Sequence, residues 1–263
     1  MNLQNILNEL ESVDGEIFDR LAHVSRRNMF SMWANKAAKV AAPAVLVSAF
    51  GSAYGQSGLP QNVVDVLNFA LTLEYLEAEF YVRGTDTPNL IPQIYRTVFL
   101  QIRKHEEAHV RLLQSVLGAQ AVKKPTFDFT AKGAFPGVFA NFETFAALAQ
   151  TFEDVGVRAY KGQAGNLLNA PAVLEVALNI HSVEARHAAK VRELRGQEPW
   201  ITRDMTSTGV PAPVYAGENQ TTQLGVNLMA VSGKSQDAVT ESFDEPLTKE
   251  QVLALAGPFI AAM

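Results

Sequence analysis

Two short segments of this 263-residue chain carry glutamate and histidine at a spacing suited to binding a metal ion. Glu106 and His109 form one Glu-x-x-His segment, and Glu184 and His187 form a second one. Residues three apart lie on the same face of an α-helix, with their Cβ atoms about 5–6 Å apart. Each pair can therefore bind one ion together if its segment is helical.

Two further glutamates, Glu74 and Glu153, recur in step with these pairs. A tyrosine follows each of them after seven residues: Tyr81 follows Glu74, and Tyr160 follows Glu153. The two copies of each feature lie 78 or 79 residues apart. The chain thus contains two copies of one helical pair, in which the additional glutamate of each copy bridges or closes the metal pair. The predicted metal ligands are Glu74, Glu106, His109, Glu153, Glu184 and His187.

The charge of this set indicates what it would bind. Four carboxylates in an apolar interior would repel one another and lose their hydration. Two divalent cations would neutralise them, and carboxylate oxygen with imidazole nitrogen suits Fe or Mn, and also Zn. We therefore predict two divalent metal ions, Fe or Mn, as cofactors. Such a pair can exchange two electrons with O2 or H2O2, so a small oxidant is the expected partner.

Tyr81 and Tyr160 are the candidate catalytic residues. Each lies two helical turns from the glutamate of its own segment and on the same face. In one interpretation they hydrogen-bond a metal ligand or supply an electron. In the other they are ordinary tyrosines of the core, and the spacing fits both interpretations.

Four helices are needed to position these residues. Apolar residues recur with helical spacing over residues 63–83, and Gly84 is expected to end this helix. Three more helices are expected over residues 92–117, 142–161 and 171–195, each ending at a glycine: Gly118, Gly162 and Gly196. The connections are short, long and short. This order predicts an all-α four-helix bundle with one long crossover between helices two and three.

The predicted organisation has three parts. Residues 1–55 form an N-terminal segment, residues 56–196 the bundle, and residues 197–263 a mostly irregular tail. In the tail, Thr248 and Gln251 predict a capping box for a short last helix through Ala256. The rest of the tail is expected to wrap the bundle or to stay mobile.

The N-terminal segment resembles a twin-arginine export signal. Arg26 and Arg27 precede a mildly apolar stretch, residues 40–50, that is too short to span a bilayer. This interpretation predicts a protein exported to the periplasm, with no stable membrane span. The alternative is a cytoplasmic protein with an amphipathic N-terminal helix.

Composition excludes several other classes of site. The chain has no cysteine, and therefore no disulfide, thiolate metal site or cysteine nucleophile. Its net charge is -5, and the basic pair at Lys123 and Lys124 is too short for a nucleic-acid-binding surface. We expect no nucleic-acid partner, and a homo-oligomer is compatible with the sequence.

Residues 62–196 resemble the ferritin-like domain family, which includes bacterial exported proteins and plant desiccation-related proteins. Four segments carry the resemblance: LNFALTLEYLEAEFY (67–81), HEEAHVRLL (105–113), TFEDVGVRAY (151–160) and VEARHAAKVR (183–192). The resemblance implies a ferritin-like four-helix bundle with a di-iron or di-manganese carboxylate site, whose usual ligand set is the one predicted above. It also implies that Glu74 and Tyr81 are the ligand and the tyrosine of the first ferritin helix.

The resemblance does not choose the reaction. The wider group includes ferroxidases, manganese catalases and members of unknown activity, so an oxidoreductase active in stress protection is the leading expectation. The long tail after Gly196 differs from a cage-forming ferritin and argues against iron storage. A non-catalytic protein that binds metal, or that protects surfaces during drying, is the alternative.

A third interpretation comes from His105, which completes the His-Glu-x-x-His motif typical of zinc metalloproteases. Glu106 would then be the general base. The matching position of the second copy is Val183, so this interpretation leaves the repeat unexplained.

Several other ionisable residues are placed outside the metal site. Glu77 shares a face with Glu74, but its counterpart in the second copy is Gly156. We therefore predict that Glu77 is a neighbour of the site or part of a surface ion pair. Glu107 and Asp154 point away from the site and are expected to be solvated, whereas His23 and His181 are expected to be structural or exposed.

Overall fold

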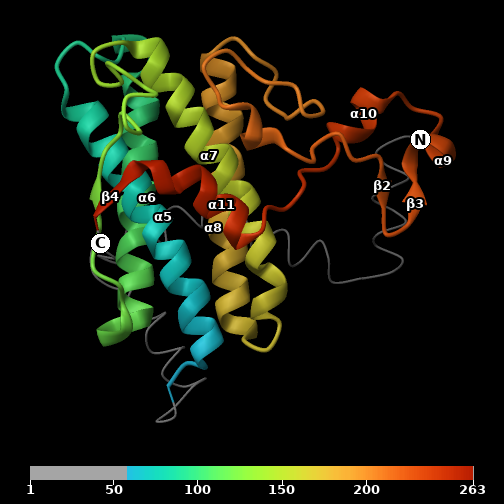
Figure 1. The fold of residues 1–263 in the computed structure, drawn as a ribbon, viewed down its shortest axis with the longest axis horizontal. Coiled ribbons are helices and arrows are strands. Elements are labelled where there is room, and N and C mark those ends of the chain that lie inside the picture. Colours follow the sequence, from blue (N-terminus) through green and yellow to red (C-terminus); the bar gives the residue numbers. More distant parts are fainter. Residues whose placement is uncertain (1–57, 263) are drawn as a thin grey trace, which may run out of the picture. The chain divides into compact units, whose positions relative to one another are not determined.

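The computed structural model describes residues 58–262, so the predicted export signal lies outside the described residues. Four long helices form a bundle (Figure 1): α5 (Gln61–Asp86), α6 (Gln93–Leu117), α7 (Phe142–Ala164) and α8 (Pro171–Leu194). Helix α5 packs along α6, and α7 packs along α8. No helix in this part of the chain is both long and apolar enough to cross a membrane.

A long crossover joins α6 to α7. It contains the 3-10 helix η2 (Gly118–Gln120) and strand β1 (Thr126–Phe127), whereas α7 and α8 are joined by the short 3-10 helix η3 (Gly165–Leu167). In Figure 1 the crossover returns along the bundle, so that α6 and α7 run in the same direction. The predicted all-α four-helix bundle with one long crossover is confirmed.

The helix ends follow from local chemistry. The Asn141 side chain caps α7 by accepting a hydrogen bond of 3.0 Å from the backbone N–H of Thr144. Pro171 begins α8, at a position where its missing N–H leaves no hydrogen bond unmade. Gly118 and Gly196 follow α6 and α8 with φ of 54° and 70°, which glycine adopts without steric cost.

Gly84 and Gly162 do not end their helices, contrary to the prediction. Helices α5 and α7 each continue for two residues beyond them. A Cβ atom at Gly84 would lie 2.2 Å from Cε2 of Phe145, and one at Gly162 would lie 1.9 Å from the carbonyl oxygen of Leu247. Both glycines are therefore required for the close approach of another segment.

Aromatic side chains form a large part of the core. Phe80 of α5 and Phe145 of α7 are fully buried, and their rings stack with 4.7 Å between centroids. Phe129 of the crossover lies 5.5 Å from the ring of Phe80. These contacts fix the crossover to the two helices on which it packs.

The end of the tail wraps the bundle, which is one of the two predicted alternatives. Helix α11 (Lys249–Ala256) lies against α7, and the predicted capping box between Thr248 and Gln251 is present. The 3-10 helix η5 (Gly257–Phe259) follows, and strand β4 (Ile260–Ala262) then pairs with β1 in antiparallel orientation. The chain end is thus hydrogen-bonded to the crossover.

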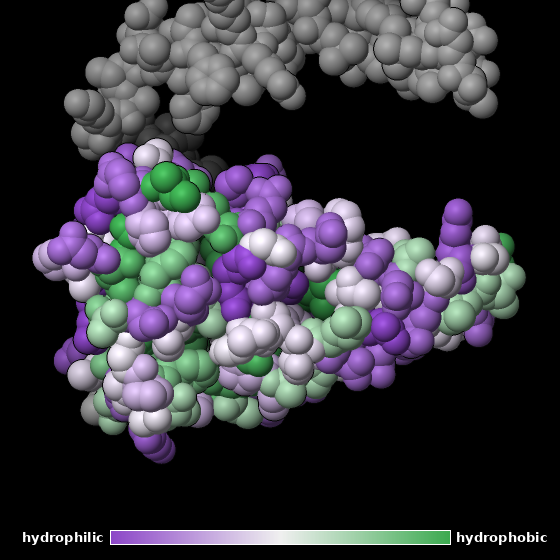
Figure 2. Space-filling view, turned by 90° about the horizontal axis from the view of Figure 1, so that it is seen from above, coloured by the Kyte–Doolittle hydropathy of each residue, from purple (hydrophilic) through white to green (hydrophobic). Residues whose placement is uncertain are grey.

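The first part of the tail contains shorter elements: η4 (Ala212–Tyr215), β2 (Thr222–Gln223), β3 (Val226–Asn227), α9 (Leu228–Ser232) and α10 (Gln236–Thr240). Strands β2 and β3 form an antiparallel hairpin. The hairpin and α9 project as an arm at the right of Figure 1. In Figure 2 the surface at the right, where this arm lies, shows hydrophobic and hydrophilic residues mixed together.

Candidate metal centre

All four bundle helices contribute to one buried cluster of ionisable side chains. The exposed fraction is 0% for each of the four glutamates, and it is 8% and 5% for the two histidines. The residues of the cluster are Glu74 on α5, Glu106 and His109 on α6, Glu153 on α7, and Glu184 and His187 on α8. The structure therefore brings together the six predicted ligands.

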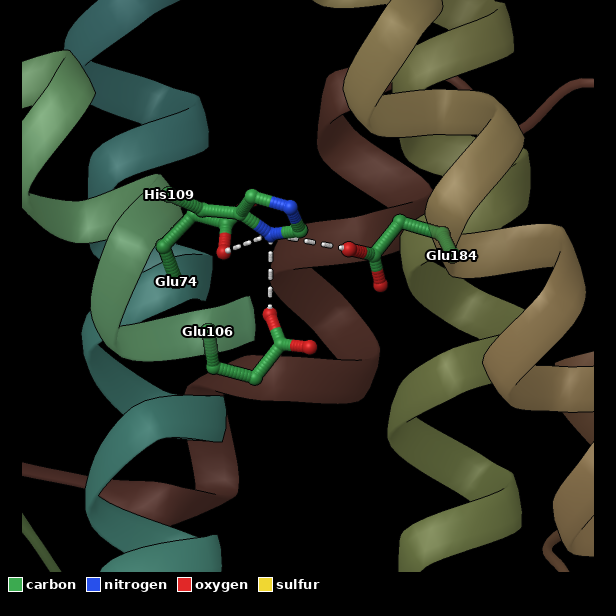
Figure 3. Close-up of side chains that lie close together, drawn as sticks. All are labelled: Glu74, Glu106, His109 and Glu184. Carbon is green, nitrogen blue, oxygen red and sulfur yellow. Dashed lines mark hydrogen bonds and ion pairs between the residues drawn. The ribbon is translucent and has the colours of Figure 1, made fainter. Parts of the chain in front are cut away.

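One half of the cluster surrounds His109 (Figure 3). Its Nδ1 lies 3.2 Å from Oε2 of Glu74, 3.1 Å from Oε2 of Glu106 and 3.2 Å from Oε1 of Glu184. One ligand atom from each of these four residues lies within 4.8 Å of all the others. This spacing allows a single ion to contact all four residues.

The other half surrounds His187. Its Nδ1 lies 2.9 Å from Oε1 of Glu106 and 3.2 Å from Oε2 of Glu153. Glu184 completes this group, again with ligand atoms within 4.8 Å of one another. Glu106 and Glu184 belong to both groups. Of the two predicted alternatives for Glu74 and Glu153, to bridge or to close the metal pair, their membership of one group each fits the second, and Glu106 and Glu184 would be the shared ligands.

The hydrogen bonds of the cluster leave several of its polar atoms unsatisfied. Within the described residues, several buried atoms lack a hydrogen bond of good geometry: Oε1 of Glu106, Oε2 of Glu153, both carboxylate oxygens of Glu184 and Nδ1 of His187. Buried carboxylate oxygens without partners are costly. Cations between them would satisfy these atoms, so the donor set fits a pair of divalent ions.

A comparison with protein families agrees with this geometry. The model of the ferritin-like domain matches residues 62–197, which include all four bundle helices and the six clustered residues. The chain belongs to the ferritin-like domain family. No curated protein matches the sequence.

In this ferritin-like protein, the cluster shifts the pKa values of its own members. Burial raises the pKa of Glu106 to about 7, and it raises the pKa of Glu184 well above its usual value. Burial lowers the pKa of His187, but the carboxylates of Glu153 and Glu106 outweigh burial and raise it to about 11. Neighbouring carboxylates raise the pKa of His109 in the same way. Without metal, protonated imidazoles therefore balance part of the negative charge.

Tyr81 and Tyr160 hydrogen-bond two of the clustered carboxylates. The Tyr81 hydroxyl donates to Oε1 of Glu153, and the Tyr160 hydroxyl donates to Oε1 of Glu74 at 2.5 Å. Each tyrosine thus holds the glutamate of the other helix pair and not that of its own helix. Burial and the adjacent carboxylate raise the pKa of both phenols, so they remain protonated donors.

Glu77 is a buried neighbour of the cluster and not a surface residue. It is 4% exposed, and burial together with the charge of Glu184 raises its pKa well above the usual value. A Cβ atom at Gly156 would lie 3.0 Å from Oε2 of Glu184 and 3.2 Å from Oε1 of Glu77. The missing side chain at Gly156 therefore leaves room for both carboxylates.

Asp154 is not solvated, and the prediction for it was wrong. It is 2% exposed, and its Oδ2 lies 2.6 Å from Nη2 of Arg192 and accepts a hydrogen bond of 2.8 Å from Tyr215. Tyr215 belongs to the tail segment η4, which covers this face of α7. Helical periodicity could not reveal the burial, because Asp154 is enclosed by Arg192 of another helix and by Tyr215 from outside the bundle.

The other residues placed outside the site fit their predictions where the structure describes them. Glu107 is partly exposed and pairs with Arg103 at 3.0 Å, and His181 is half-buried. His23 lies outside the described residues.

His105 belongs to neither ligand group of residues 58–262 and contacts His187 instead. The zinc-protease interpretation requires His105 and His109 to bind the same ion, and this arrangement does not allow it.

Proposed function

We propose that this protein holds two redox-active ions, Fe or Mn, between its six clustered ligands and reacts with O2 or H2O2 in stress protection. The observation that carries the proposal is the overlap of two ligand groups, each with three carboxylates and one imidazole. Ions of this kind supply the electron-transfer chemistry with a small oxidant when they are bound.

The residues of the chain would bind and orient the ions. Glu106 and Glu184 belong to both groups and would keep the two ions adjacent. The two tyrosines hold the unshared carboxylates, Glu153 and Glu74, in position. Fixed ligands of this kind preserve the geometry of the centre during the reaction.

Burial of the centre supports a small substrate. None of the six ligands is more than 8% exposed, so a large molecule could not reach the ions without opening the bundle. The surrounding helices also exclude bulk water, which strengthens electrostatic interactions at the centre. O2 and H2O2 are small enough to satisfy this restriction.

The donor atoms support Fe or Mn. Oxygen-rich sites with imidazole suit these ions, whereas thiolate ligands, which favour zinc or copper, cannot occur in a chain without cysteine. Elemental analysis of the protein from its native source should find two Fe or Mn ions per chain. O2 evolution from H2O2, and O2 consumption with a reductant, would then test turnover.

The outcomes of this experiment separate the candidate functions. Two ions with turnover would support the oxidoreductase. Two ions without turnover would instead indicate a non-catalytic metal-binding protein, and one zinc ion per chain would contradict the proposal. Glu153→Ala should lose bound metal and any turnover. Glu143→Ala, which removes an exposed glutamate from the same helix, should keep both.

A further inference from the structure

His105 makes a direct contact with one of the two histidines of the centre. Its Nδ1 lies 2.8 Å from Nε2 of His187, the ring nitrogen that faces away from the carboxylates. The two ring planes are inclined by only 12°, with centroids 5.1 Å apart, so the rings lie edge to edge. His105 comes from α6 and His187 from α8. The contact therefore spans two helices.

The outer side of His105 is also occupied. Its Nε2 lies 2.7 Å from the side-chain amide nitrogen, Nε2, of Gln101, one helical turn earlier on α6, and a 180° rotation of the amide would place its oxygen there. An amide can donate through nitrogen or accept through oxygen, so it can match either tautomer of the imidazole. Gln101, His105 and His187 thus form a continuous row of hydrogen bonds from an exposed side chain to the centre.

This row determines which nitrogen of His187 faces the ions. A ligand histidine must present an unprotonated nitrogen to the metal, so its hydrogen then lies on the other nitrogen. With Nδ1 toward the centre, Nε2–H of His187 donates to Nδ1 of His105. Nε2–H of His105 then donates to the amide oxygen of Gln101, once a 180° rotation of the amide exchanges that oxygen with the nitrogen now facing His105. Every polar atom of the row then has a partner.

The other half of the centre has no equivalent. The residue that corresponds to His105 in the second copy is Val183, whose side chain has no polar atom. Within residues 58–262, the hydrogen bonds and ion pairs of His109 all involve Nδ1, and no side chain or backbone group pairs with its Nε2. Yet each half offers three carboxylates and one imidazole. The two halves thus have the same ligand types but differ in the support behind the histidine.

We propose that His105 is a positioning residue that holds the ring of His187, and that this makes the two ion positions unequal. This inference rests on the proposed metal pair. The ion beside His187 would bind more tightly and first, because its imidazole is already oriented. The ion beside His109 would bind second, since binding must also order an imidazole without an outer partner. Groups that orient a ligand histidine typically change metal affinity by about 10- to 100-fold.

The test compares His105→Leu with His105→Asn in the full chain. Asparagine places an amide oxygen near the position of Nδ1 and can accept the hydrogen of His187, whereas leucine cannot. Calorimetric titration with Mn2+ should show two binding steps for the wild-type protein. His105→Leu should weaken one step by about 10- to 100-fold and leave the other within a few-fold. His105→Asn should restore the weakened step, and Val183→Leu should leave both unchanged.

Crystals grown with one equivalent of Mn2+ locate the first ion by its anomalous scattering. The ion should lie beside His187 in the wild-type protein and in His105→Asn, and it should move to His109 in His105→Leu. Equal weakening of both steps, unchanged steps, or no rescue by asparagine would overturn the inference. If the leucine variant does not fold, the wild-type ion position and the asparagine variant still decide. Failure of the wild-type protein to bind two ions would instead overturn the proposed function.

Discussion

At the scale of single residues, shared and unshared carboxylates have different roles. Glu106 contacts both histidines of the centre, through Oε2 to His109 and through Oε1 to His187. Of the two histidines, Glu74 contacts only His109. Loss of a shared carboxylate therefore affects both ion positions, and loss of an unshared one chiefly affects its own half.

The first prediction concerns Glu106→Gln. An amide keeps the shape of the side chain but removes the charge from both ion positions, so we expect both Mn2+ binding steps to be lost or strongly weakened. Glu107→Gln is the matched control, because the adjacent Glu107 pairs with Arg103 at the surface. Equilibrium dialysis followed by elemental analysis measures the stoichiometry. Two ions bound to the Glu106 variant would show that this carboxylate does not bridge them.

A second prediction at this scale concerns pH. Metal must displace the protons held by His187, with a pKa of about 11, and by Glu106, with a pKa of about 7. We therefore expect the apparent affinity for Mn2+ to rise with pH. More protons should be released per ion at pH 6 than at pH 8, where Glu106 is already largely ionised. Calorimetry in buffers of different ionisation enthalpy counts these protons, and a pH-independent affinity would contradict the assignment.

The metal-free protein should respond to pH in the opposite sense. The folded-state pKa of His187, about 11, lies above the unfolded value of about 6.5. Its contribution to stability is therefore complete below about pH 6.5 and is lost as the pH rises through the folded value. The raised pKa of Glu106 acts in the same direction between about pH 4.5 and 7. Denaturant unfolding measures both effects: as the pH rises, the stability of the metal-free protein should fall, and the stabilisation gained from added Mn2+ should grow.

At the scale of the elements, the close approach of helix α7 to the tail depends on one small residue. Gly162 lies under the backbone of Leu247, just before α11, and the N–H of Leu247 donates to the carbonyl oxygen of Arg158 at 3.1 Å. The tail therefore contacts the helix backbone directly. This contact holds α11 against the bundle.

The prediction for this element is that Gly162→Ala displaces the tail. The new Cβ atom would lie 1.9 Å from a backbone carbonyl oxygen, which cannot move by a change of rotamer. We expect a loss of about 1–3 kcal/mol in the free energy of unfolding, measured with urea. At Gly165 a Cβ atom would meet nothing within 4 Å, so Gly165→Ala is the control. Equal stability of the two variants would mean that the tail yields without cost.

At the scale of the whole molecule, an arginine of the bundle fastens the tail. Arg158 is fully buried, and its Nε lies 2.8 Å from Oε1 of Glu218 and 2.7 Å from the carbonyl oxygen of Glu245. Its other nitrogens donate to the carbonyl oxygens of Val214 and Ala216. One side chain thus joins two separate segments of the tail, residues 214–218 and Glu245, which makes the tail part of the folded unit.

Arg158→Met should therefore destabilise the protein strongly. It leaves the buried Glu218 without its cation, and breaking a buried pair from one side typically costs about 3–5 kcal/mol. Lys190→Met is the control, because Lys190 pairs with Glu193 at the surface, where such pairs contribute about 0–1 kcal/mol. Urea unfolding measures the difference, and limited proteolysis should show the tail released first. A loss as small as that of the control would show that the tail does not depend on this residue.

The four helices, their order and the six side chains of the centre could all be predicted from the amino-acid sequence. These features rest on local rules, because helical periodicity and the spacing of Glu106 from His109 depend on nearby residues only. The internal repeat then indicated that each helix pair turns the same kinds of side chain toward the other pair. For the same reason, the capping box at Thr248 was predicted correctly in an otherwise irregular tail.

The partner that each side chain meets could not be predicted in this way, because it depends on how distant segments pack together. Periodicity shows the face on which a residue lies, but not the segment that covers that face. Tyr81 therefore holds Glu153 and not its own-helix partner, Asp154 is buried beneath the tail, and Gly162 permits a close approach instead of ending a helix. Each of these contacts joins segments that are distant in the chain, and such contacts follow from packing in three dimensions.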